Sequence, residues 1–220
     1  MKLPKNIIYY GKDEPLAKNI QIKAGPLNLI YEAGDLRYIK FNEIEIVRRV
    51  YVALRDHNWD TIKSSISNMQ INTTKDSFEI TYDVENIQDD INFIWKATIV
   101  GKSNGSISFK MDGKALSTFL RNRIGFCILL PMECSGTKTQ INHVDGTIEQ
   151  SVFPKQIAPQ LIIEGRPSPV EPFSNMRALM LNMSPELIVK LNFEGDDFEM
   201  EDQRNWTDAS FKIYSTPLKY

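Results

Sequence analysis

Hydrophobic and polar residues alternate with a period of two along much of the chain, which is typical of strands with one buried face. Three successive stretches show the pattern most clearly: 78–84, 91–99 and 107–111. Short polar connections at 86–90 and 101–105 separate them and contain the residue types that close hairpins. The pattern therefore predicts consecutive antiparallel strands.

The same alternation continues on both sides of this region. Upstream, Leu27–Tyr31 and Leu36–Phe41 are predicted strands, and the β-branched residues of Glu43–Leu54 favour one long strand over a helix. Downstream, the pattern resumes at Ile188–Phe193, and the one helix candidate is a short segment at Lys114–Arg121. Strands without long intervening helices exclude a doubly wound α/β fold. We predict an all-β fold, a large antiparallel β-sandwich with at most one short helix.

The segment from Pro154 to Pro172 is rich in proline and interrupts this regular patterning. It is open to two interpretations, a linker between domains or a long ordered crossover within one domain. The apolar run Leu161–Ile163 favours the crossover. Because sandwiches of ~200–250 residues commonly form one unit, we predict a single β-sandwich domain over residues 1–220.

Composition and charge exclude several classes of partner. The chain is 42% hydrophobic and 25% charged, with a formal net charge of −2 and no stripe of Lys or Arg. This composition disfavours nucleic acid, whose binding depends on neutralising phosphates. The longest apolar run, Ile124–Met132, is too short to span a bilayer, and the N-terminus lacks the apolar core of a secretory signal. We expect no membrane partner, a cytoplasmic location, and two reduced, buried thiols at Cys127 and Cys134.

Polar and ionisable groups are densest between Glu194 and Tyr214. Seven acidic residues lie there: Glu194, Asp196, Asp197, Glu199, Glu201, Asp202 and Asp208. Aromatic and apolar residues between them favour an ordered strand-turn-strand over a solvated tail. If the strand is extended, Asp202 shares a face with Phe198, whereas Glu199 and Glu201 lie on the other face. Arg204 is the expected partner of the acidic groups. A ligand-facing polar cluster and an internal salt-bridge corner both fit this pattern.

Two arginines, Arg121 and Arg123, stand at the mouth of an apolar strand, and Gly125 allows a close backbone approach. Because the guanidinium donates in two directions, this pair suits the hydroxyls and carboxylate of a sugar acid. In the alternative interpretation, one of the arginines neutralises the acidic stretch.

His143 and Asp145 fall on one face if their segment is extended. A carboxylate at that spacing could fix the imidazole tautomer and raise its pKa, as a general acid requires. The alternative is a hydrogen-bonded structural histidine. Since a zinc or iron centre needs three or four ligands, we expect no metal here. His57 and Trp59 lie in a polar turn that is either structural or ligand-lining, and no motif for a cofactor occurs.

Several segments resemble the amino-terminal β-sandwich domain of the D-apionate lactonase family. They are Asn122–Cys127 (Asn-Arg-Ile-Gly-Phe-Cys), His143–Gly146 (His-Val-Asp-Gly), Phe153-Pro154, Pro159, Pro172-Phe173 and Phe193–Ser215. The last segment is long and unusual enough to be specific, and the resemblance spans about Gly34 to Leu218. It implies a galactose-mutarotase-like supersandwich and a place in bacterial sugar-acid breakdown, where an aldonolactone is opened to its acid.

Family members continue into a TIM-barrel-like middle domain and a further domain. Either this chain is the N-terminal part of a longer multidomain protein, with that barrel and a sugar acid or its lactone as partners, or it is a short stand-alone relative; the resemblance favours the first. Barrels carry chemistry at the carboxyl ends of their strands, so we expect the isolated domain to be inactive.

Three hypotheses follow for the function. The first is a carbohydrate-recognising or supporting domain of a sugar-acid lactonase. Its expected ligand-binding residues are Arg121, Arg123, His143, Asp145, Asp202, Arg204, Trp206 and Asp208. The second is a stand-alone mutarotase-like sugar epimerase with Glu199 or Glu201 as the base and His143 as the acid. The third is a purely structural or interaction domain, in which the acidic stretch locks two sheets together.

Overall fold

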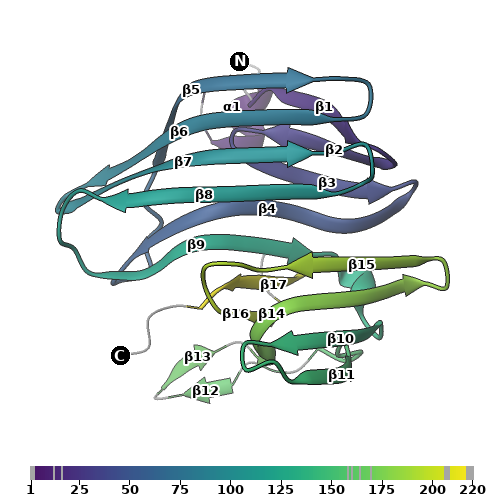
Figure 1. The fold of residues 1–220 in the computed structure, drawn as a ribbon. Helices are drawn as coiled ribbons and strands as arrows, with labels where there is room; N and C mark the ends of the chain where they lie inside the picture. The colour runs from purple at the N-terminus through teal and green to yellow at the C-terminus, as the bar shows by residue number, and fades with distance from the viewer. Residues whose placement is uncertain are drawn as a thin grey trace.

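A computed structural model describes residues 3–11, 13–15, 17–157, 159, 161–163, 165–168, 170–205 and 209–216. The chain folds almost entirely as antiparallel strands in one large sheet and one smaller sheet (Figure 1). This confirms the predicted all-β sandwich. Among the described residues, no helix is long and apolar enough to cross a membrane.

The smaller sheet has four strands in chain order. They are β5 (Ser64–Thr73), β6 (Phe78–Gln88), β7 (Ile91–Gly101) and β8 (Ile107–Ala115). On β6 and β7, alternate residues are buried, as the period of two predicts. The buried side chains face the larger sheet, where Phe109 contacts Phe126 with ring centroids 5.0 Å apart and the Tyr82 hydroxyl donates to Gly34 O at 2.7 Å.

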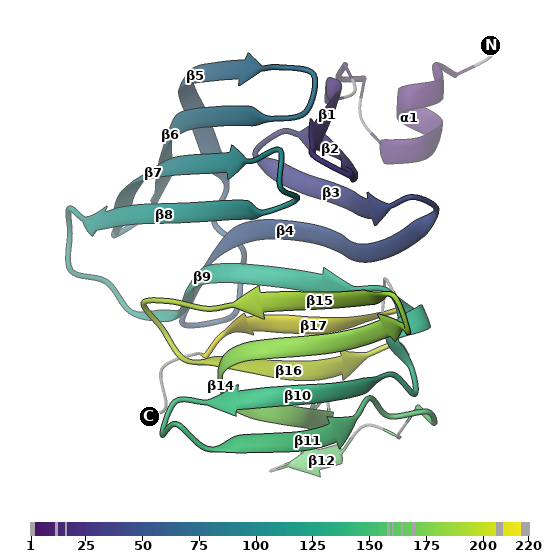
Figure 2. The same cartoon turned by 45° about the vertical axis from the view of Figure 1, so that its right-hand side comes forward.

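The larger sheet has eleven strands and extends well beyond the smaller one (Figures 1 and 2). Its path is β1 (Asn19–Ala24), β2 (Leu27–Glu32), β3 (Asp35–Phe41), β4 (Ile44–Asp56), β9 (Arg121–Leu130), β17 (Ser210–Ser215), β16 (Phe198–Gln203), β14 (Val170–Ser184), β10 (Lys138–His143) and β11 (Ile148–Val152). Strand β15 (Leu187–Asn192) pairs with the second half of β14, while β16 pairs with its first half. The predicted long strand at Glu43–Leu54 is confirmed as β4.

The proline-rich segment forms a small separate hairpin of β12 (Leu161–Ile163) and β13 (Arg166–Ser168) that leads into β14. A short 3-10 turn, η1 (Met132–Cys134), joins β9 to β10. Buried apolar side chains from β1 to β17 form one continuous group that includes both sheets. Cys127 and Cys134 are free and buried, as expected.

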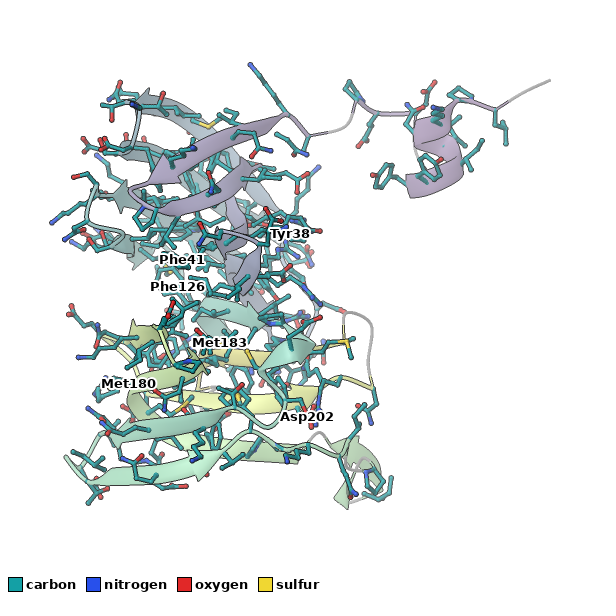
Figure 3. The ribbon with its side chains drawn as sticks, turned by 90° about the vertical axis from the view of Figure 1, so that its right-hand side faces the viewer. Tyr38, Phe41, Phe126, Met180, Met183 and Asp202 are labelled. Carbon is teal, nitrogen blue, oxygen red and sulfur yellow. The ribbon has the colours of Figure 1, made fainter. Side chains whose placement is uncertain are left out.

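The predicted helix at Lys114–Arg121 is wrong. Strand β8 continues to Ala115, and an extended connection leads to β9. Hydrogen bonds to the start of β7 hold this connection: Leu116 N donates to Asn92 O at 2.8 Å, and Asn92 N donates to Ser117 Oγ at 3.0 Å. These tertiary partners replace the hydrogen bonds that a helix would make within itself. The short helix is instead α1 (Lys5–Tyr10), which stands apart from the sandwich (Figures 2 and 3).

Candidate functional site

The acidic stretch forms an antiparallel hairpin of β16 and β17, and its polar groups are divided between the two faces of the large sheet. Phe198 and Met200 belong to the main core. Asp202 shares their face by strand alternation, whereas Glu199 and Glu201 point to the opposite face. The sequence predicted this division correctly.

On the core-side face, Asp202 and Arg204 form a buried ion pair in the half of the molecule built by β10 to β17 (Figure 3). Arg204 Nε donates to Asp202 Oδ1 at 2.8 Å, and its Nη2 donates to Oδ2 at 2.7 Å. The remaining donors reach Ser135 Oγ and the carbonyls of Lys155 and Gln156. Every direction of this guanidinium has a protein acceptor, so the pair fits the internal salt-bridge interpretation.

The opposite face of β4, β9, β17 and β16 carries a second group of polar residues, here named the outer-face cluster. It consists of Arg123, Glu199, Glu201, Lys212 and Tyr214. Strand register brings them together, because Tyr214 is opposite Glu199 on β16 and Cys127 on β9, and Lys212 is opposite Glu201. The Tyr214 hydroxyl donates to Glu201 Oε1. Four of the five residues are less than 10% exposed, which is unusual for charged groups on the outside of a sheet.

Arg123 is the centre of this cluster. It is only 2% exposed, and its guanidinium carbon lies 3.7 Å from the ring centroid of Tyr214 and 5.4 Å from that of Trp59. Its Nε is buried without a hydrogen-bond partner, and among the described residues no carboxylate lies within ion-pair distance of the guanidinium. A buried cationic donor without an acceptor costs free energy. Contact with the Tyr214 ring offsets part of this cost, and the Nε donor stays without an acceptor among the described residues.

The turn after β4 places Trp59 over Arg123. Asp56 Oδ1 accepts hydrogen bonds from the backbone N–H groups of Asn58 and Asp60, at 2.8 and 2.9 Å. Asn122 Nδ2, next to Arg123 on β9, donates to the carbonyl of His57 at 2.8 Å. The turn that was predicted as either structural or ligand-lining thus contributes its backbone to structure and one exposed indole to the rim of the cluster.

Electrostatics within the outer-face cluster favour uncharged forms. Burial raises the pKa of Glu199 and repulsion by Glu171 raises it further, whereas a hydrogen bond with Tyr214 and the charge of Arg123 oppose these effects. Burial also lowers the pKa of Lys212. The cluster therefore contains groups that can donate or accept hydrogen bonds but are costly to keep charged without a ligand.

We expect Glu199→Gln to stabilise the protein at neutral pH. A carboxyl whose pKa is raised by folding contributes stability at low pH and loses it as pH rises through the folded-state pKa. The variant lacks this loss, so its advantage should grow as pH rises above 4.5, the ordinary pKa of the group. Urea unfolding of both proteins from pH 4 to pH 8 measures the difference. A constant difference over this range would contradict the assignment.

Arg121 lies on the other side of the sheet from Arg123, although the two are only two positions apart. The register of β4 and β9 shifts at this point, with Arg55 opposite Arg123 and Asp56 opposite Arg121. This β-bulge turns Arg121 toward the space between the sheets. There it lines a cavity of about 390 Å³ together with Phe93, Ala115, Ser117, Thr118, Phe119 and Ile124. The structure thus separates the two arginines that the sequence grouped.

His143 pairs with Glu149 and not with Asp145, which corrects the predicted couple. Its Nε2 lies 3.2 Å from Glu149 Oε2, and its Nδ1 lies 3.1 Å from Ser174 O. Asp145 is not extended: it closes a tight turn by accepting from the N–H and hydroxyl of Thr147, and these hydrogen bonds lower its pKa.

His143 shares a face of β10 with the buried Ile141, which is opposite Glu149 on β11 and the core residue Leu179 on β14. Glu199 and Glu201 point to the opposite face of the same sheet. A sugar cannot reach the imidazole and either glutamate from one side, so the acid–base pairing of the epimerase hypothesis lacks support.

Sequence reasoning missed the roles of Lys212 and Tyr214. The signal was present, because they alternate with Phe211 and Ile213, which are fully buried in the main core. Trp206 and Asp208, predicted to bind ligand, lie outside the described residues. Gly125 does allow a close approach: Phe126 N donates to Ser215 Oγ at 3.1 Å, and a Cβ on Gly125 would lie 2.3 Å from that oxygen. Among the described residues, no group of three or more His, Cys, Asp or Glu side chains could hold a metal ion.

Comparison with known proteins shows the family of the chain. The family described as D-apionate lactonase, N-terminal domain, matches residues 7–220. A curated relative named D-apionate lactonase, from Brucella anthropi, is 35% identical over 213 residues, which cover 96% of this chain and 33% of the relative. The chain thus spans about a third of the length of that relative. It belongs to the family of D-apionate lactonase N-terminal domains.

Proposed function

We propose that this chain is the sugar-acid-recognising domain of a lactonase that opens an aldonolactone to its acid, with D-apionate and its lactone as the first ligands to test. Two observations support the proposal: membership of the family and the buried Nε of Arg123, which has no hydrogen-bond partner. The buried donor of Arg123 indicates where the ligand would bind, because a ligand acceptor would remove its cost. Family membership alone does not indicate a binding site.

The outer-face cluster matches the chemistry of a sugar acid. The carboxylate of the ligand would accept from the Arg123 guanidinium in a charge-assisted hydrogen bond, which removes the cost of the buried, unpartnered donor. The hydroxyls of the ligand would meet the carboxyl groups of Glu199 and Glu201, the Tyr214 hydroxyl and the Lys212 ammonium. The neighbouring residues are buried, so these hydrogen bonds would form in a medium of low dielectric constant, where they are stronger than in water.

In this proposal, hydrolysis takes place in another part of the full-length protein, for which we expect a TIM-barrel-like domain. The described residues supply binding groups on the outer face of a sheet, and the galactose-mutarotase-like supersandwich serves as the scaffold that holds them. The cytoplasmic location stays a prediction. The pairs Asp202–Arg204 and His143–Glu149 are already satisfied within the protein, so neither is part of the proposed site.

The test is a binding and turnover experiment on purified residues 1–220. We expect isothermal titration calorimetry to detect D-apionate binding, and a pH-stat assay to detect no opening of the lactone of D-apionate above the uncatalysed rate. The same assay on the D-apionate lactonase from Brucella anthropi is the positive control. Turnover by residues 1–220 alone would contradict the proposal that hydrolysis takes place in another part of the protein. An absence of binding would contradict the recognition function.

A further inference from the structure

Trp59 is an exposed aromatic residue held in an unfavourable backbone conformation. Its φ is +72°, in the left-handed region that bulky residues rarely adopt, and 47% of the residue is exposed. Such a conformation costs free energy and persists only where the surroundings enforce it. A glycine would satisfy the turn without this cost. The presence of tryptophan therefore calls for a reason other than the geometry of the turn.

The surroundings enforce the conformation from both sides of the turn. Arg55 Nη1 donates to the carbonyl of Trp59 at 2.9 Å, and the N–H of Trp59 donates to the carbonyl of Asp56 at 3.2 Å. Asp56 also accepts from the next backbone N–H, that of Asp60. The peptide groups on either side of the indole are thus fixed, and the indole projects from a rigid turn.

The Trp59 indole lies between the Arg123 guanidinium and solvent. One side of the indole is near the Arg123 guanidinium, at 5.4 Å from the ring centroid, and nearly half of the residue remains open to solvent. An aromatic face attracts the polarised C–H groups of a sugar ring, and a rigid aromatic side chain loses little entropy when it binds. The guanidinium covers one face of the indole and so leaves the other face for a ligand.

We propose that Trp59 is a stacking platform for the ring of the lactone of D-apionate, which binds on the face of the indole that the Arg123 guanidinium does not cover. This assignment rests on the proposed recognition function and adds a specificity residue to it. It distinguishes the two forms of the ligand: the cyclic lactone uses Trp59 most, whereas the open-chain acid uses the Arg123 guanidinium most.

The test compares Trp59→Gly with the wild type, using the lactone of D-apionate and D-apionate itself as separate ligands in calorimetry. We expect the affinity for the lactone to fall about tenfold and that for the acid to fall much less, since one aromatic contact is lost. Glycine suits the positive φ, so the thermal midpoint should not fall. Intrinsic fluorescence should change when the lactone binds to the wild type and change less in the variant.

Tyr38→Gly is the matched control, because Tyr38 is also an exposed aromatic residue with positive φ (51°) and an arginine 5.3 Å from its ring centroid, but lies on β3 in the upper half of the molecule (Figure 3). We expect it to bind both ligands as the wild type does. If the wild type binds and Trp59→Gly binds the lactone equally well or more tightly, the platform assignment is wrong while the recognition function stands. If the wild type binds neither ligand, the recognition function itself is wrong.

Discussion

Replacing Arg204 with methionine should lower the free energy of unfolding by about 3–5 kcal/mol. The substitution leaves the Asp202 carboxylate, which is 5% exposed, without its ion-pair partner, and removing one member of a buried pair is strongly destabilising. It also removes the donors that tie the β16–β17 hairpin to Ser135, before β10, and to the carbonyls of Lys155 and Gln156, after β11. Urea unfolding at neutral pH measures the loss.

Arg177→Met is the control for this prediction. Arg177 also forms an ion pair, with Asp197 at 2.9 Å, but both side chains are more than 40% exposed. Exposed pairs contribute about 0–1 kcal/mol, so this variant should lose no more than that. Equal losses in Arg177→Met and Arg204→Met would show that the buried corner has no special role in stability.

Replacing Arg123 with methionine should have the opposite effect on stability and a large effect on binding. The guanidinium is as buried as that of Arg204 but has no described acceptor, so an apolar side chain of similar volume should leave the free energy of unfolding unchanged or raise it by about 1–4 kcal/mol. The loss of its contact with the Tyr214 ring offsets part of this gain.

The same variant should bind D-apionate about 30- to 1,000-fold more weakly, which corresponds to about 2–4 kcal/mol for a charge-assisted contact in a buried site. Arg121→Met is the matched control, because Arg121 faces the cavity between the sheets and should not affect this affinity. A normal affinity in Arg123→Met would contradict binding at the outer-face cluster. A loss of affinity in Arg121→Met would place the binding site in that cavity.

Measurements of stability and binding are therefore expected to distinguish the two buried arginines, Arg204 and Arg123. Arg204 holds the fold together because its five donors are directed at acceptors of the protein. Arg123 is surrounded by aromatic rings and keeps an unsatisfied donor. Proteins commonly retain such a cost where a ligand removes it.

Much of the fold could be predicted from the sequence, because the period of two is a direct consequence of strand geometry. The same geometry predicts that Asp202 lies on the opposite face of the strand from Glu199 and Glu201. The pairing of Arg204 with an acidic group was predictable from its five hydrogen-bond donors. What failed was local: Lys114–Arg121 has a helical composition, but its hydrogen bonds go to Asn92 and Asp90, which lie more than twenty residues away in sequence.

The site itself was only partly predictable. A single β-bulge at Asn122 turns Arg121 and Arg123 to opposite faces, and strand alternation alone places them on the same one. The partner of His143 depended on the register of β10 and β11, which brings Glu149 to it and leaves Asp145 in the turn. The role proposed for Trp59 depends on a backbone angle that composition does not reveal.

A crystal structure of the chain soaked with D-apionate tests the central claim most directly. The claim predicts a carboxylate oxygen of the ligand about 2.7–2.9 Å from a guanidinium nitrogen of Arg123, on the face of the sheet that carries Glu199 and Tyr214. D-apionate bound in the cavity beside Arg121, with Arg123 still lacking an acceptor, would contradict it.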